Sequence, residues 1–169
     1  WEGLGYYNRV RNLQKAARII LAEHGGVFPR EYAQVRALPG IGDYTAGAIC
    51  SICFEEPVAA VDGNVLRCVA RLDEISEPMD GPRMKRAVAS ALGTIYPMGQ
   101  CGDFTQSLME LGATTCLPGP RPRCGECPAQ GFCKARASGR AGELPTLTAK
   151  QARRIEVRTV FLLEWESKL

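Results

Sequence analysis

Four closely spaced cysteines are the residues whose type and spacing most directly indicate chemistry. They follow the pattern C-x7-C-x2-C-x5-C within eighteen residues, among prolines and glycines that cannot hold a loop together by packing. Four thiolates converging on one centre would hold such a loop, and both zinc and a cubane iron–sulfur cluster take four thiolates. Zinc sites usually pair two C-x2-C units, and only one is present here. The spacing therefore favours a [4Fe–4S] cluster and leaves zinc open; the ligands would be Cys116, Cys124, Cys127 and Cys133.

One aspartate, Asp62, stands where a reactive carboxylate could be fixed. It follows the apolar run at residues 58–61 and precedes Gly63 and a helix predicted at residues 65–72. A carboxylate in this position can cap the helix by accepting hydrogen bonds from its N–H groups. The same contacts would hold the carboxylate in one orientation, as a reactive group requires. Capping alone is the simpler interpretation, and the residues upstream favour the reactive one.

Those upstream residues form a glycine hairpin that leads into an apolar helix. Gly40 and Gly42 flank Ile41, so the backbone can turn sharply and approach a ligand closely. Asp43 is predicted to be the N-cap of a helix at residues 44–54, whose free amides and dipole would form an anion site for a nucleic-acid phosphate. No Gly-Lys-Ser/Thr follows, which excludes a P-loop, and no β-rich run precedes, which excludes a dinucleotide site. A helix–turn–helix corner without a ligand stays open.

The rest of the chain must position these groups, and its apolar spacing predicts a mostly α-helical fold. Helices are expected from Asn8 to the glycine pair at 25 and 26, at residues 28–38 and 84–95, and from Gly102 onward. Residues 155–163 are rich in β-branched side chains, and apolar and charged residues alternate at their start, which is typical of a strand. The remaining cysteines carry no ligand pattern. Cys50 and Cys53 are expected to be buried in the hairpin helix, and Cys68 and Cys101 to be ordinary thiols.

Composition indicates an ordinary globular chain. It is 46% hydrophobic and 23% charged, and its net charge of +3 permits nucleic-acid binding without arguing for it. A basic stretch at residues 121–158 is a candidate phosphate-facing surface, or a solvated tail. No apolar run reaches the length of about 18 residues that a membrane helix needs, and no signal peptide is predicted, so no membrane partner is expected. Eight cysteines without a secretory signal favour a reducing, intracellular setting.

Three motifs resemble, in order, those of helix-hairpin-helix DNA glycosylases of base-excision repair, and in particular their adenine-specific (MutY) branch. They are WEGLGYYNRVRNLQKAA at residues 1–17, the hairpin and aspartate loop at 38–67, and the cysteine cluster, so the resemblance covers residues 1 to about 136. It implies a helix-hairpin-helix glycosylase fold with a C-terminal iron–sulfur cluster loop. The expected parts are a helical lobe at 1–115, incomplete at its N-terminus, the cluster loop at 116–136, and a linker with the start of an absent C-terminal domain at 137–169.

The resemblance also implies an activity, a partner and a cofactor. Members of this branch hydrolyse the N-glycosidic bond of adenine mispaired with 8-oxoguanine or guanine in double-stranded DNA. We therefore expect a monomeric DNA-repair enzyme, in the cytoplasm or nucleoid of a bacterium or in the nucleus or mitochondrion of a eukaryote. The family carries a [4Fe–4S] cluster on a C-x6-C-x2-C-x5-C pattern, and the first gap in this chain is one residue longer.

By the same resemblance, Asp62 faces the sugar of the flipped nucleotide, and Tyr44 and Asn64 support it by hydrogen bonding. Relatives of the endonuclease III type carry a lysine at the position of Tyr44. No lysine lies between residues 15 and 85, so a monofunctional hydrolase is expected. Tyr6 is the implied wedge in the base stack. The other expected DNA-binding residues are Leu38, Gly40, Ile41, Gly42, Arg121 and Arg123.

The general acid of this branch is a glutamate upstream of the WxGLGYY motif, which lies outside this sequence. Glu2 is within the motif itself and does not match that position. We therefore expect the chain to bind DNA and to cleave it weakly or not at all.

Three other functions stay open on the sequence. A helix-hairpin-helix DNA-binding module with a structural metal and no catalysis would not need a carboxylate at position 62. A pyrimidine-lesion glycosylase/lyase of the endonuclease III type would need a lysine near Tyr44. A zinc-ribbon interaction protein would be colourless, whereas an iron–sulfur protein is brown.

Overall fold

The computed structural model describes residues 1–149 and 156–161, and its regular structure there is helical, which confirms the predicted mostly α fold. A π-helical turn over Leu111–Thr115 continues the sixth helix, and a 3-10 turn spans Cys124–Glu126. The α-helices are α1 (Tyr7–Glu23), α2 (Tyr32–Ala37), α3 (Asp43–Phe54), α4 (Gly63–Leu72), α5 (Pro82–Gly93), α6 (Cys101–Glu110) and α7 (Lys134–Ala137).

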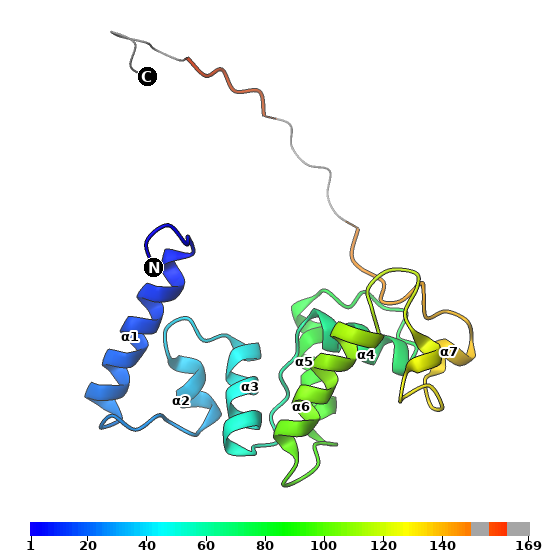
Figure 1. Cartoon of the computed structure of the whole chain (residues 1–169), viewed down its shortest axis with the longest axis horizontal. Coiled ribbons are helices and arrows are strands. Elements are labelled where there is room, and N and C mark those ends of the chain that lie inside the picture. The colour runs from blue at the N-terminus through cyan, green and yellow to red at the C-terminus, as the bar shows by residue number, and fades with distance from the viewer. Residues whose placement is uncertain (150–155, 162–169) are drawn as a thin grey trace.

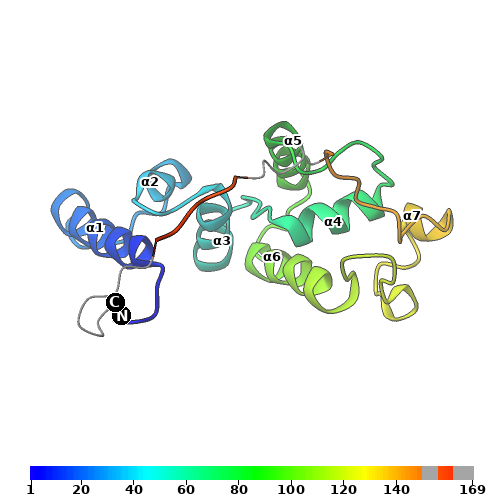
Figure 2. The ribbon, with the colours of Figure 1, turned by 90° about the horizontal axis from the view of Figure 1, so that it is seen from above.

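Helix α3 joins two groups of helices (Figure 1). On one side α2 packs against it through Val35, Ala46 and Cys50, with α1 beyond. On the other side α6 lies along it, and the buried Thr105 hydroxyl donates to Ser51 Oγ at 2.8 Å. Seen from above, α4 runs from the end of α3 towards α7 and the cysteine loop (Figure 2). One helix therefore positions both the hairpin before it and the aspartate loop after it.

The largest core lies between α4, α5 and α6. The sequence of α4 places apolar residues on one face at helical spacing, and Val65, Leu66 and Ala70 are buried there. Val88 and Leu92 of α5 complete the packing, together with Tyr96, whose ring meets Phe104 edge-on at 4.9 Å between centroids. This core fixes the direction of α4, at whose N-terminus Asp62 lies.

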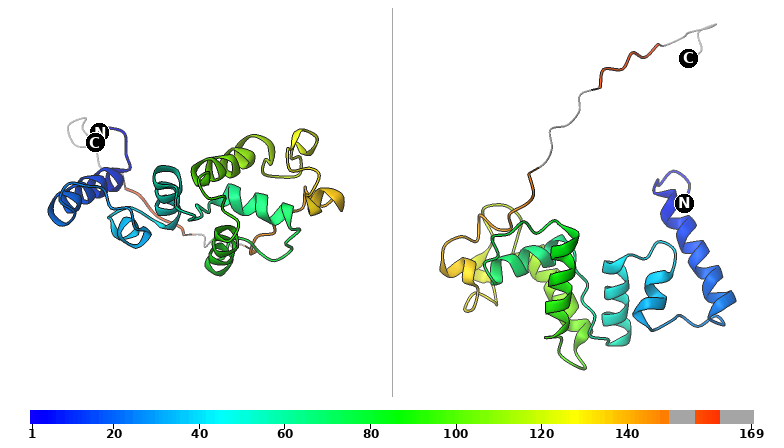
Figure 3. Two further views of the ribbon diagram at one scale, coloured as in Figure 1. Left: turned by 90° about the horizontal axis from the view of Figure 1, so that it is seen from below. Right: turned by 180° about the vertical axis from the view of Figure 1, so that it is seen from behind.

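Helix α1 buries little of its apolar surface. Ala16 is its buried residue, whereas Leu13 and Leu21 are 68% and 69% exposed. The views from below and from behind place α1 at the outer end of the helix group, next to α2 (Figure 3). In the part of the chain that the structure describes, no helix combines the length and the apolar character needed to cross a membrane.

Several predicted helix starts are wrong. The helices expected at residues 65–72 and 84–95 are α4 and α5, and both begin two residues earlier, after the Asp62 cap and at Pro82, because proline suits the first turn of a helix. Helix α2 begins at Tyr32 rather than at residue 28, since Phe28 and Arg30 instead pack on the ring of Phe54, at 6.3 Å and 5.3 Å from its centroid. Helix α3 begins at Asp43 with Gly42 as its N-cap, because the Asp43 carboxylate turns to Arg36 instead of capping the helix.

Two further predictions need correction. Cys50 is buried as expected, but Cys53 is exposed, because it lies on the solvent face of α3. Of the strand predicted at 155–163, residues 156–161 form no regular structure, and the other three residues lie outside the described part. An alternating pattern makes a strand only where a neighbouring strand can pair with it.

Candidate functional site

Asp62 is held in one orientation at the start of α4. Its Oδ1 accepts a hydrogen bond from the Val65 amide at 2.8 Å, which makes it the N-cap of the helix as predicted. Its Oδ2 accepts a second bond from Asn64 Nδ2 at 3.2 Å. The side chain stays partly exposed, so the carboxylate is fixed by the helix terminus and can still be reached by a ligand.

Arg67, which the sequence did not single out, extends this contact into the interior. Its guanidinium donates to Asn64 Oδ1 at 2.7 Å, to the Gly112 carbonyl at 2.7 Å and to the Cys116 carbonyl at 2.7 Å. Asn64 therefore bridges a carboxylate and a guanidinium, which sets the orientation of its amide. Hydrogen bonds connect Asp62 to the first residue of the cysteine cluster through two side chains.

Two glycines let the backbone approach this loop closely. A Cβ at Gly112 would lie 2.6 Å from Cβ of Asn64, and a Cβ at Gly47 would lie 2.4 Å from the Ala59 carbonyl oxygen. Neither distance can be tolerated without movement of the neighbouring backbone. Helix α3 and the π-helical turn after α6 thus both pack closely against residues 59–64, and only glycine at these two positions permits this approach. Sequence analysis missed both, since the close approach depends on segments distant in the chain.

Tyr44 lies on the first turn of α3 and is 42% exposed. Its hydroxyl is directed to the Met109 sulfur of α6 at 3.8 Å rather than to Asp62. The ring lines a cavity of about 610 Å³ that also includes Val61, the residue before Asp62, and Lys85 and Arg86 of α5. Tyr44 thus shares a cavity with the residue before Asp62, and it makes no hydrogen bond to Asp62 itself.

The glycine hairpin has the sharp turn that was predicted. Gly40 has φ +82°, and a Cβ there would lie 2.8 Å from Cβ of Asn12, so the hairpin packs against α1. Leu38 is buried and anchors the hairpin, while its carbonyl accepts from the Ile41 amide at 3.1 Å. Gly42 lies in open space at the α3 N-terminus. The four residues predicted to bind DNA here therefore form one compact turn.

Arg36 and Asp43 join α2 to α3 across this hairpin. Arg36 Nε donates to Asp43 Oδ1, and its Nη1 donates to the Ile41 carbonyl at 3.0 Å. The Tyr32 hydroxyl donates to the same carboxylate oxygen at 3.4 Å. The hydrogen bond and charge of Arg36 lower the pKa of Asp43 below its usual range, so the carboxylate stays ionised near neutral pH.

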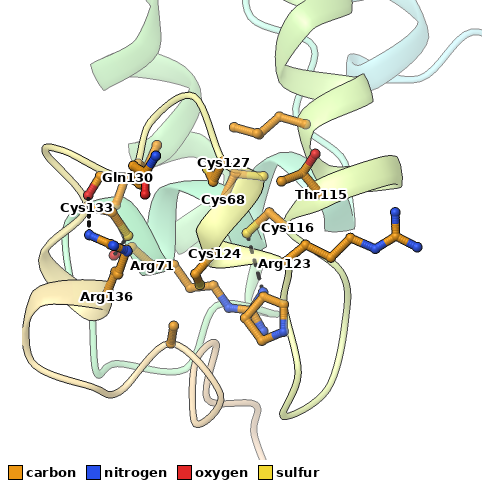
Figure 4. Close-up of a pocket in the computed structure, with 14 residues that line it drawn as sticks. Cys68, Arg71, Thr115, Cys116, Arg123, Cys124, Cys127, Gln130, Cys133 and Arg136 are labelled. Atoms are coloured by element: carbon orange, nitrogen blue, oxygen red, sulfur yellow. Dashed lines mark hydrogen bonds between the residues drawn. The ribbon is translucent and has the colours of Figure 1, made fainter.

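The four cluster cysteines line one small pocket with Arg71 of α4 (Figure 4). Arg71 is 2% exposed and binds the loop through the carbonyls of Leu117, Gly119 and Leu144 at 2.7 to 3.0 Å. It also donates to Cys116 Sγ at 3.3 Å. A buried guanidinium whose donors meet backbone carbonyls fixes the loop to α4. Sequence analysis missed Arg71, because an arginine within an amphipathic helix is usually a surface residue.

Cys68, expected to be an ordinary thiol, also lines this pocket and is buried. Its hydrogen bond to Cys116 lowers the pKa of the Cys116 thiol to about 6, and Arg71 acts in the same direction against the effect of burial. The same contact and burial raise the pKa of Cys68. Burial raises the pKa of Cys124 as well. Both contacts favour the thiolate of Cys116, the form in which cysteine binds metals.

The donor chemistry of this pocket fits an iron–sulfur cluster or zinc, because four thiols line it together. Among residues 1–149 and 156–161, no three His, Cys, Asp or Glu side chains lie close enough together to hold a metal ion.

The basic side chains after residue 120 divide into two kinds. Some form ion pairs: Lys134 with Asp73, and Arg158 with Glu156. Arg140 pairs with both Glu74 and Glu143. Arg121 and Arg123 are exposed on the cluster loop, and neither guanidinium is in an ion pair within the described residues. Tyr6, at the N-terminus of α1, is 78% exposed with φ 48°. These three side chains are open to a large ligand.

Comparisons with known proteins agree on one group of enzymes. The chain is 41% identical to mouse adenine DNA glycosylase over 151 residues, which is 89% of the chain and 29% of the relative. It is 46% identical to the Arabidopsis thaliana enzyme of the same name over 136 residues (80% and 21%), and 35% identical to the Mycobacterium tuberculosis one over 161 residues (90% and 52%). No protein-family model matches the chain.

Solved structures give the same fold. A non-covalent endonuclease III–DNA complex aligns with a TM-score of 0.64 and 28% identity, over 79% of this chain and 60% of that one. A thermostable thymine-DNA glycosylase aligns with a TM-score of 0.63 and 28% identity, over 76% and 58%. The predicted helix-hairpin-helix glycosylase fold is confirmed. The chain spans between a fifth and about half of the length of the curated relatives named above.

Proposed function

Over the region that it shares with its relatives, this chain belongs to the adenine-specific (MutY) branch of the helix-hairpin-helix DNA glycosylases, and we propose that it acts in the excision of adenine from DNA. The proposed reaction is hydrolysis of the N-glycosidic bond of adenine mispaired with 8-oxoguanine or guanine. The observation that carries the proposal is the fixed, reachable carboxylate of Asp62 at the α4 N-terminus, directly after the hairpin helix.

Such an enzyme must first take the adenine out of the duplex. The bond to the sugar then breaks as an acid protonates the leaving adenine, and a fixed carboxylate stabilises the positive charge that builds up on the sugar. Water then forms the new bond at the sugar carbon and completes the hydrolysis. Asp62 is the proposed stabilising group, since Val65 and Asn64 already hold its two oxygens. Tyr44 supports the same site from the wall of the adjoining cavity. No reorientation of the carboxylate is then needed during the reaction, which is how preorganised groups accelerate a step.

The proposed DNA surface combines the hairpin with three exposed side chains. The amides of residues 40–42 at the start of α3 would receive a backbone phosphate. Arg121 and Arg123 would meet further phosphates, and Tyr6 would enter the base stack. The partner is duplex DNA with an adenine mispair, bound by a monomer inside the cell compartment that holds the DNA.

The cofactor proposed for the loop is a [4Fe–4S] cluster, which would be held by Cys116, Cys124, Cys127 and Cys133. When bound, it supplies a cross-link that orders a loop poor in apolar contacts. Arg71 holds the same loop from inside, and the loop presents Arg121 and Arg123. The cluster thus has a positioning role, and the reaction at Asp62 uses the side chains of the protein.

We expect a monofunctional hydrolase, because Tyr44 occupies the position at which lyases carry lysine. The structure also identifies one candidate amine, because Lys85 of α5, distant in the sequence, lines the same cavity as Tyr44. A lyase would form a Schiff base between such an amine and the sugar. Borohydride treatment during the reaction should therefore trap no covalent protein–DNA complex. Trapping that disappears in Lys85→Ala would show that α5 supplies a nucleophile after all.

The test is excision from a duplex with one adenine opposite 8-oxoguanine, with protein in excess over DNA. Alkali should reveal strand scission at the adenine, and no scission should occur without alkali. Asp62→Asn should abolish the alkali-dependent product while leaving DNA affinity intact; Asp103→Asn, an exposed aspartate on α6, is the matched control. Equal scission by wild type and Asp62→Asn would contradict the assigned role. Tight binding without scission would fit an enzyme that needs the upstream glutamate, and the next test is a longer chain that carries it. Binding without scission in that longer chain as well would favour the alternative, a DNA-binding module whose Asp62 only caps α4.

A further inference from the structure

We infer that Arg36 is a positioning residue for the DNA backbone contact of the hairpin, because it neutralises the Asp43 carboxylate and locks the turn at Ile41. The inference rests on the proposed DNA-binding function and adds a residue that lies outside the hairpin itself. It concerns the bonds that α2 makes across the turn to α3.

The contacts of Arg36 span the whole turn. One guanidinium nitrogen donates to the first residue of α3, and another donates at 3.0 Å to the carbonyl of Ile41, at the centre of the hairpin. Tyr32, one helical turn earlier on α2, donates to the same carboxylate oxygen at 3.4 Å. The Ile41 carbonyl therefore points towards α2, and side chains of α2 hold the turn in place.

The position of Asp43 makes this neutralisation necessary. A carboxylate on the first residue of α3 stabilises the free helix, since it lies at the positive end of the dipole. The same charge opposes any phosphate that approaches the amides of residues 40–42. Asp43 is exposed, with 79% of its side chain accessible, so water alone would have to screen this repulsion. The Arg36 guanidinium cancels the charge directly, and Arg86 of α5 adds a weaker attraction to the same carboxylate.

The exposed pair should matter more for binding than for stability. Ion pairs with both partners accessible to water contribute little to folding. Arg36 is itself 45% exposed, so its loss leaves the core between α2 and α3 unchanged. A phosphate close to the unpaired carboxylate would be repelled, and we expect this repulsion to lower the affinity about fivefold.

The experiment measures the affinity of the full chain for a fluorescent duplex with one adenine opposite 8-oxoguanine, across a range of salt concentrations. Arg36→Ala should weaken binding about fivefold. The double variant with Asp43→Asn should return to within about twofold of wild type, since the two changes are coupled. Arg18→Ala, an exposed arginine on α1, removes the same net charge and should stay within about twofold of wild type. Unfolding midpoints of all four proteins should agree closely.

Two results would overturn the inference and leave the proposed function standing. One is wild-type affinity in Arg36→Ala. The other is a double variant as weak as Arg36→Ala, with a salt dependence reduced by about one ion, which would mean that Arg36 contacts a phosphate itself. A wild-type chain that binds no duplex at all would instead refute the proposed function, and the inference with it. Whether the wild type binds the duplex therefore distinguishes failure of the Arg36 inference from failure of the proposed function.

Discussion

Asp62 owes its orientation to residues near it in sequence and to one partner far away. The bonds from the Val65 amide and from Asn64 reach Asp62 within four consecutive residues, and sequence analysis singled out both Asp62 and Asn64 as site candidates. Sequence analysis missed Arg67, because the carbonyls to which it donates belong to Gly112 and Cys116, 45 and 49 residues further along the chain. A motif identifies residues that act together locally, whereas the residue that holds the motif against another segment becomes visible only in the fold.

Replacing Asn64 by alanine should slow adenine excision and leave DNA affinity nearly unchanged. The change removes the amide that bonds Asp62 and Arg67, and hydrogen bonds to charged groups contribute roughly 1.5–3 kcal/mol. If that contribution acts on the transition state, the single-turnover rate falls roughly 10- to 100-fold. Gln106→Ala, an exposed amide on α6, serves as the control. An unchanged rate in Asn64→Ala would show that the orientation of Asp62 does not limit the reaction.

The titration of Asp43 should report the pair with Arg36. The pKa of this carboxyl is lowered, so the contribution of the pair is present above the unfolded value of about 4 and is lost as pH falls through the lowered pKa. Carbon-detected NMR of the Asp43 side chain should follow this transition below pH 4. In Arg36→Ala the pKa should rise towards its ordinary value. A titration that is identical in both proteins would mean that the ion pair does not form in solution.

At the scale of elements, α4 connects the two ends of the site. Asp62 caps its N-terminus, and Arg67 and Arg71, one turn apart, bind the segment from Gly112 to Leu144 from its buried face. Amphipathic spacing predicted the helix itself. It could not predict two buried arginines, because a charged residue is buried only where other segments supply acceptors. The starts of α2 and α3 were misplaced for a related reason. Side chains near each start contact a neighbouring helix, and these contacts cannot be read from the local sequence.

Gly112→Ala should destabilise the chain and also slow excision. The added methyl would meet Cβ of Asn64 at 2.6 Å, so either the π-helical turn or the start of α4 must shift. Overpacking of this kind costs about 1–3 kcal/mol of the free energy of unfolding, which thermal or urea unfolding can measure. At Gly81 the new methyl meets nothing within 4 Å, so Gly81→Ala loses only a glycine N-cap of α5 and should cost less than about 1 kcal/mol. Equal stability of the two variants would argue against the close approach.

At the scale of the whole molecule, the chain combines a helical body with a cysteine loop tied to α4 at one end. The motif order predicted this arrangement, and the fold agrees with that of solved DNA glycosylases. The domain boundaries at 115 and 136 and the DNA contacts of Tyr6, Arg121 and Arg123 stay predictions. The strand expected at 155–163 was wrong over residues 156–161, since a pattern read along one segment cannot supply the partner that a strand needs.

Loss of the cluster should loosen one region and leave the rest folded. Cys116→Ser should lower the iron content and the brown absorbance of the protein and increase hydrogen exchange at residues 116–136, while α3 to α6 keep their protection, because their core contains none of the four ligands. Cys53→Ser, an exposed thiol outside the pocket, should retain full colour. Zinc in place of iron in the wild type would overturn the cluster assignment, and equal loss of protection throughout would contradict the local role of the loop.

The most direct measurement of the central claim is the release of free adenine. Protein in excess is incubated with a duplex that carries one isotopically labelled adenine opposite 8-oxoguanine, and the released base is quantified by mass spectrometry. The account predicts that the wild-type chain liberates intact adenine, that Asp62→Asn liberates none while binding the duplex equally well, and that Asp103→Asn behaves as wild type. Release of adenine by Asp62→Asn at the wild-type rate would contradict the assignment of Asp62 as a catalytic carboxylate.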